Sequence, residues 1–142
     1  MAEEPFGTPA RALMLRAHLG GARHADSLSP MYFALLDGHP YDFAVEPTFG
    51  VGGYGRATVN NTAALWGTPT LSTLQVTNLE DIIWPNSSAA WSTAATPLTH
   101  WAVYASATGA VLWYVGKLAT PRIVDVAGIQ PRLLAGSLNI MV

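Results

Sequence analysis

Residues 98–116 read LTHWAVYASATGAVLWYVG, and this stretch decides the fold class. Two runs rich in aromatic and branched aliphatic residues, residues 98–106 and 111–116, flank the segment Ala107-Thr108-Gly109. Such composition favours β-strands, and a short link that contains glycine is typical of a hairpin turn. The stretch therefore predicts two antiparallel strands joined by a tight turn.

The rest of the chain adds further strands of similar length. Residues 31–36 (MYFALL) are apolar on both faces and end in the turn Asp37-Gly38-His39-Pro40, as expected of a buried central strand. Other strand-like runs are residues 54–60, 81–84, 118–126 and 137–142, of which residues 118–126 are interrupted by Pro121. We expect long connections at residues 41–53 and 87–97. The pattern predicts an all-β fold, an antiparallel β-sandwich or barrel of about seven short strands.

One short helix is predicted before the first strand. Thr8 can cap it, Pro9 suits its first position, and Gly20-Gly21 ends it after residues 8–19. The length of 142 residues suits one domain. We expect an N-terminal arm and helix over residues 1–30 and the sandwich over residues 31–142.

The low charge content favours an assembly. Half of the residues are hydrophobic and 11% are charged, against roughly 25% charged residues in average domains. A monomer with so few charges exposes neutral or apolar surface, which usually marks contacts with other proteins. The alternative is a well-packed monomer from an alanine-rich proteome.

The charges also argue against two classes of partner. A net charge of −2 and the single lysine Lys117 leave no basic surface for nucleic acid. The apolar runs are shorter than the ~20 residues that span a bilayer, and Glu3, Glu4 and Pro5 stand where a secretory signal carries basic residues. We expect neither nucleic-acid nor membrane binding, and a protein that stays in the cytoplasm where it is made.

No residue set predicts catalysis, a cofactor or a metal site. Gly50, Gly52 and Gly55 match G-x-G-x-x-G, but a loop precedes them and a strand follows, the reverse of a dinucleotide site. They predict a flexible or tightly turned entry into a strand. The histidines lie in four predicted elements, and the sequence has no cysteine, so neither a metal cluster nor a thiol nucleophile is expected. The histidines are His18, His24, His39 and His100.

Aromatic residues are the remaining candidates for a site. Trp84, Trp101 and Trp113 lie within predicted strands and are expected in the core. Aromatic residues in weakly structured segments are expected to be exposed, where they can anchor a protein partner. These interface candidates are Phe6, Tyr41, Phe43, Phe49, Trp66 and Trp91.

The order of several segments resembles a family of small accessory virion proteins of tailed phages, which includes minor tail, tail-fibre-like and head-decoration proteins. The resemblance covers most of the chain, apart from the aromatic residues of the loop 38–52 and residues 66–79. The similar segments are residues 10–19, 31–37 (MYFALLD), 53–57 (GYGRA), 83–85 (IWP), 90–92 (AWS), 98–104 (LTHWAVY), 107–109 (ATG), 112–114 (LWY) and 131–136 (PRLLAG).

The resemblance implies a non-enzymatic virion protein, assembled in the host cytoplasm. Its partners would be copies of itself, for example in a trimer, and the major capsid protein or tail proteins. The preferred hypothesis is a capsid decoration (cement) or minor capsid subunit that binds the outer shell. The alternatives are a minor tail or fibre-associated structural protein and a carbohydrate-binding receptor module with Trp66 and Trp91 at its surface.

Overall fold

The predicted hairpin is present in the computed structural model, which describes residues 29–69, 72 and 75–141. Strands β5 (Leu98–Tyr104) and β6 (Leu112–Arg122) pair antiparallel. Their connection is closed by a bond from the backbone N–H of Ala105 to the carbonyl of Val111 at 3.0 Å. The prediction of a separate strand at residues 118–126 is wrong, because β6 runs through Pro121 to Arg122. A proline is tolerated there because β6 is an edge strand.

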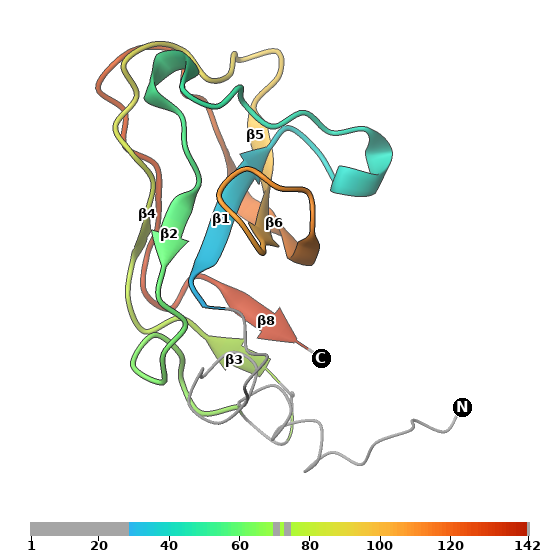
Figure 1. Ribbon diagram of the computed structural model, residues 1–142, viewed down its shortest axis with the longest axis vertical. Coiled ribbons are helices and arrows are strands. Elements are labelled where there is room, and N and C mark those ends of the chain that lie inside the picture. The colour runs from blue at the N-terminus through green and yellow to red at the C-terminus, as the bar shows by residue number, and fades with distance from the viewer. Residues whose placement is uncertain (1–28, 70–71, 73–74, 142) are drawn as a thin grey trace. The chain divides into compact units, whose positions relative to one another are not determined.

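Strand β1 (Met31–Leu36) lies inside a four-stranded antiparallel sheet of order β2-β1-β5-β6 (Figure 1). It pairs with β2 (Ala57–Val59) on one side and with β5 on the other, so that Phe33 stands opposite both Ala57 and Val103. Five of its six residues are buried. This confirms the predicted central strand.

Both faces of this sheet are covered by apolar side chains. Residues two apart in a strand point to the same face of the sheet. Phe33 stands opposite Val103, two residues from Trp101, so Phe33 and Trp101 share one face, and their ring centres lie 6.2 Å apart. Trp84 is fully buried and donates from Nε1 to the Phe33 carbonyl at 2.9 Å. The opposite face holds a buried cluster, against which Ala44, Leu112 and Val115 pack: Ala34, Leu36, Ala102 and Tyr104.

Trp84 and Trp101 are therefore core residues as predicted, but Trp113 is 40% exposed, and the prediction for it is wrong. The register explains the difference. Val103 stands opposite Tyr114, whereas Tyr104 stands opposite Leu112, so Trp113 is the extra residue of a β-bulge. A bulge breaks the alternation of side chains, which sequence periodicity assumes.

A second group of segments is organised around a buried asparagine. Strands β3 (Gln75–Thr77) and β8 (Asn139–Met141) pair antiparallel. Asn78 is fully buried, its Nδ2 donates to the carbonyls of Glu80 and Leu134, and its Oδ1 accepts from the N–H of Leu138. One side chain thus satisfies backbone groups of two segments that are far apart in the sequence.

The described residues divide into two compact units, one formed by Ser29 and the described parts of 60–82 and 133–141 and the other by residues 30–59 and 83–132. Strands β4 (Ile82–Ile83) and β7 (Arg132–Leu133) form a further two-stranded sheet. The helical elements described are the 3-10 turns η1 (Pro40–Asp42) and η2 (Val51–Gly53). The all-β antiparallel class is confirmed, and the helix expected at residues 8–19 lies outside the described residues. Within the described part of the chain, no helix is long and apolar enough to cross a membrane.

Candidate functional site

Residues 37–56 form the loop between β1 and β2. Asp37 closes the first part of this loop with two hydrogen bonds. The backbone N–H of Asp37 donates to the Val45 carbonyl at 3.1 Å, and the N–H of Val45 donates to Asp37 Oδ1 at 2.6 Å. Between these residues, His39 caps η1 by accepting from the N–H of Tyr41 at Nδ1. This part of the loop is a small ring of backbone held by local hydrogen bonds.

The second part of the loop is held by a buried ion pair. Arg56, whose side chain is 3% exposed, donates from Nε and Nη2 to the two carboxylate oxygens of Glu46 at 2.9 and 2.8 Å. Its Nη1 donates to the carbonyls of Ser106 and Gly109, both at 2.8 Å. Arg56 therefore connects the loop to the β5–β6 turn, and its charge is paired and hydrogen-bonded, as burial requires.

Two aromatic rings and a tyrosine hydroxyl complete this framework. The guanidinium carbon of Arg56 lies 3.8 Å from the ring centre of Tyr104 and 5.1 Å from that of Phe49. The Tyr54 hydroxyl donates to Glu46 Oε1 at 2.7 Å and accepts from the Leu35 N–H at 3.2 Å. Burial, followed by the charge of Glu46, raises the pKa of Tyr54 well above its ordinary value. The hydroxyl therefore stays protonated and keeps donating.

The glycines of this loop shape its last turn. Gly50, Gly52 and Gly53 have φ of 80°, 61° and 76°, and η2 leads through Tyr54 into β2. A β-carbon on Gly52 would lie 2.9 Å from the Ala89 carbonyl oxygen. The prediction of a tightly turned strand entry is confirmed.

On this framework the loop exposes a set of large apolar side chains, which we call the loop surface. Phe43 is 96% exposed and Tyr41 80% exposed, and three further members are partly exposed: Val45, Phe49 and Val51. Phe43 also has φ 57° and ψ 32°, the left-handed region that side chains other than glycine, asparagine and aspartate rarely occupy. The loop thus places an aromatic ring in solvent on a strained backbone.

The sequence-predicted interface residues divide into four groups, of which the last is Trp66. Tyr41, Phe43 and Phe49 lie together on the loop surface. Trp91 is partly buried beside this loop, donates from Nε1 to the Gly52 carbonyl at 2.7 Å and contacts Tyr54 edge-on. Phe6 lies outside the described residues.

Trp66 differs from its expectation, because it is 4% exposed. Its Nε1 donates to Asn61 Oδ1 at 3.0 Å, and it forms an isolated bridge with Asn78. The sequence around Trp66 is weakly patterned, which predicts an exposed ring. In the structure, backbone contacts with residues 77–79 hold this segment so that Trp66 is buried. The prediction that its ring is exposed is wrong.

Two histidines that the sequence placed in separate elements lie together. The ring centres of His39 and His100 are 6.1 Å apart, and His39 also contacts the ring of Tyr41 at 5.2 Å. Burial lowers the pKa of His100, and the charges of His39 and Lys117 lower it further, against a smaller opposite effect of Asp42. Within the described residues, no group of three or more potential ligands gathers to hold a metal.

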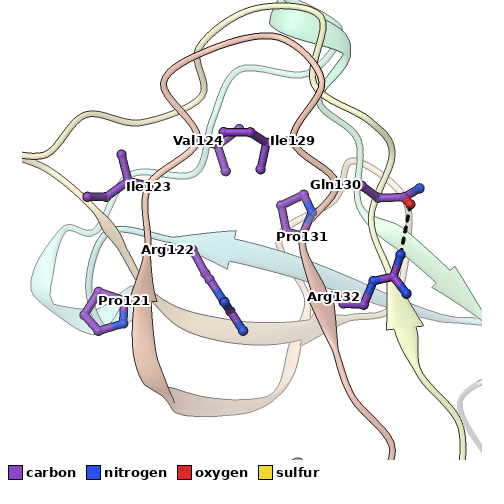
Figure 2. A pocket seen from close by; sticks show the side chains of 8 residues that line it. All are labelled: Pro121, Arg122, Ile123, Val124, Ile129, Gln130, Pro131 and Arg132. Atoms are coloured by element: carbon purple, nitrogen blue, oxygen red, sulfur yellow. Dashed lines mark hydrogen bonds between the residues drawn. The ribbon is translucent and has the colours of Figure 1, made fainter.

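A pocket of about 260 Å³, which sequence reasoning missed, lies between the end of β6 and the start of β7 (Figure 2). The connecting loop closes one end, where Val124 and Ile129 lie opposite each other. The repeated pair Pro-Arg, at residues 121–122 and 131–132, is the sequence signal that could have indicated it. The lining residues are Pro121, Arg122, Ile123, Val124, Ile129, Gln130, Pro131 and Arg132.

These features define an all-β protein of antiparallel sheets with an exposed apolar loop. Residues 8–141 match the model of the family described as "Podophage GP4 fiber I protein gp80". Because the match covers nearly the whole chain, the chain belongs to this family. A comparison with curated proteins gives no match.

Membership in a fibre-protein family makes the chain a structural protein of a bacteriophage and a component of the virion. The resemblance to accessory virion proteins is thus confirmed at the level of a phage fibre-type protein. The capsid-decoration hypothesis is not confirmed, and the fibre-associated alternative agrees better with the family.

Proposed function

We propose that this chain is a non-enzymatic, fibre-associated subunit of a tailed phage, which binds neighbouring virion proteins through the loop surface. The observation that carries the proposal is Phe43, which is 96% exposed at a left-handed backbone position. Folding alone gains nothing from this arrangement, because the ring is not buried and the backbone strain costs about 1–2 kcal/mol. Burial of such a ring against a partner would contribute about 1.5–3 kcal/mol.

The rigidity of the loop supports a docking role. A surface that is ordered before binding loses less conformational entropy on association. Asp37 holds the first part of the loop, and the Arg56–Glu46 pair holds the second. Tyr41 and Phe43 are therefore presented on a fixed frame. The partners we propose are other fibre or tail proteins and further copies of the same chain.

The carbohydrate-binding alternative is weakened by the burial of the residues on which it depended. Trp66 is buried, and Trp91 is partly buried with its Nε1 bonded to Gly52. The Trp66 ring is thus not available for a sugar to stack on, and the Trp91 ring is partly covered, with an edge-on contact to Tyr54. We therefore favour a protein partner for this surface.

The test uses the phage that encodes the chain, propagated with a tagged copy of the protein. The doubly substituted variant Tyr41→Ser/Phe43→Ser is compared with Leu134→Ser, which removes another exposed apolar side chain, 55% accessible, in the other unit. Quantitative mass spectrometry of purified particles, separated into heads and tails, measures incorporation. We expect the double variant to fall at least about tenfold and the control to match wild type.

Two results would overturn the proposal. One is a double variant that folds and enters particles as well as wild type, which would remove the loop surface from assembly. The other is wild-type protein spread over the head shell in many copies, which would return the function to capsid decoration.

A further inference from the structure

The polar groups of the arginine-lined pocket are suited to an anion. Its polar lining residues are Arg122, Gln130 and Arg132, and none of its eight lining residues is acidic. Gln130 Oε1 accepts a long bond of 3.4 Å from Arg132 Nη2, drawn in Figure 2, and its amide nitrogen can donate. The side chain of Arg122, at the end of β6, makes no hydrogen bond or ion pair with any residue that the structure describes. An entering oxyanion would therefore meet the donors of Arg122, which lies with Pro131 between the two segments in Figure 2.

The walls of the pocket are fixed by the segment 84–92. Ser87 alone makes four bonds to the connecting loop: its Oγ donates to the Val126 carbonyl and accepts from the Ile129 N–H, and its backbone bonds to Gly128 and Ile129. Trp84 donates to the Pro131 carbonyl, and Trp91 and Ser92 both donate to that of Val124. The ligand would thus not have to order the pocket, which favours binding.

The size and the lining residues of the pocket limit the classes of ligand that it can bind. The volume of about 260 Å³ lies below the roughly 300–1,000 Å³ of pockets for drug-sized ligands. The apolar lining consists of proline and branched aliphatic residues, with no aromatic ring as a platform for a sugar. One protein side chain that carries a carboxylate on a short apolar stem fits these properties. Arginine forms paired hydrogen bonds with carboxylates and is enriched at protein interfaces.

We propose that this pocket binds the carboxylate of an Asp or Glu side chain that a neighbouring virion protein presents within an apolar segment. Arg122 would hold the carboxylate, and the prolines would contact the flanking apolar residues. The inference rests on the proposed function, since it names a second contact of the same subunit with its partners.

The experiment uses the full chain labelled with ¹⁵N and two blocked peptides, acetyl-Leu-Glu-Leu-amide and acetyl-Leu-Gln-Leu-amide. NMR titration follows the backbone signals of residues 121–132. We expect the Glu peptide to bind at least about fivefold more tightly than the Gln peptide. Arg122→Gln should weaken binding of the Glu peptide about tenfold, because hydrogen bonds to charged groups are strong.

Lys117→Gln is the matched control, because it removes the same charge from an exposed position of β6 outside the pocket lining. Equal weakening by the two substitutions would show general charge attraction and overturn the proposal. So would tighter binding of glucuronate or inorganic phosphate than of the Glu peptide, or the absence of any Glu preference. These outcomes concern the pocket alone. If the loop surface does not bind a partner, the Tyr41→Ser/Phe43→Ser variant would instead be incorporated into particles as well as wild type.

Discussion

Arg56 donates two hydrogen bonds, of 2.9 and 2.8 Å, to the two carboxylate oxygens of Glu46, ten residues earlier in the chain. This pair fixes the loop that carries Tyr41 and Phe43. It also connects that loop to the β5–β6 turn, through the bonds of Arg56 to the carbonyls of Ser106 and Gly109. The exposed surface therefore depends on a buried charge pair.

Removal of the buried guanidinium should be costly. In Arg56→Met, the Glu46 carboxylate and two carbonyls lose their donor, and we expect the free energy of unfolding to fall by about 3–5 kcal/mol. Urea denaturation measures the change, with Lys117→Gln as an exposed-charge control that should lose less than about 0.5 kcal/mol. A loss below about 1 kcal/mol for Arg56→Met would show that the pair contributes little to the fold.

The close approach of Gly116 to Trp101 gives a second prediction. These residues are cross-strand neighbours, and a β-carbon on Gly116 would overlap the indole ring. Gly116→Ala should therefore lower the free energy of unfolding by about 1–3 kcal/mol, because the ring must move within a filled core. Gly55→Ala is the control, since nothing lies within 4 Å of its β-carbon position. Equal stability of the two variants would contradict the packing of Trp101 over Gly116.

The backbone at Phe43 allows docking to be separated from stability. Asparagine tolerates the left-handed conformation better than phenylalanine, and a ring that is 96% exposed contributes little burial. We expect Phe43→Asn to keep or raise the free energy of unfolding by up to ~1 kcal/mol while particle incorporation falls. Denaturation and mass spectrometry of particles measure the two effects. A clear loss of stability would mean that Phe43 serves folding rather than binding.

The histidine pair should make stability depend on pH. The pKa of His100 is lowered from 6.5 in the folded protein by burial and by the charges of His39 and Lys117, with Asp42 opposing. The folded state therefore binds this proton less readily than the unfolded chain does. The contribution of His100 is present above pH 6.5 and is lost as the pH falls through the lowered pKa.

NMR titration of the His100 ring and denaturation across this pH range measure the effect. His100→Gln should flatten the dependence of stability on pH, and Thr58→Ala, an exposed neutral change on β2, should not. A His100 pKa above 6.5 would reverse the sign and contradict the expectation.

Much of the fold follows from local pattern. The alternating aromatic and aliphatic residues of 98–116 and the apolar run 31–36 predict β5, the start of β6 and β1, because strand formation depends on the periodicity of neighbouring residues. Tyr41, Phe43 and Phe49 were also identified correctly as exposed, because the loop between the strands lacks periodicity. The predictions for Trp113 and Trp66 are wrong, since the exposure of Trp113 depends on a β-bulge and the burial of Trp66 on contacts with residues 77–79.

The sequence by itself determined the antiparallel all-β class, the central strand, the hairpin and the aromatic loop, because each is encoded by residues close together in the chain. Only the tertiary structure decided which side chains meet: Arg56 with Glu46 and the β5–β6 turn, His39 with His100, and Arg122 with Arg132 around one pocket. The physical reason is that these contacts depend on strand register and loop closure, which bring together residues that no local spacing relates. The apolar loop could be foreseen, but the buried pair that holds it in place could not.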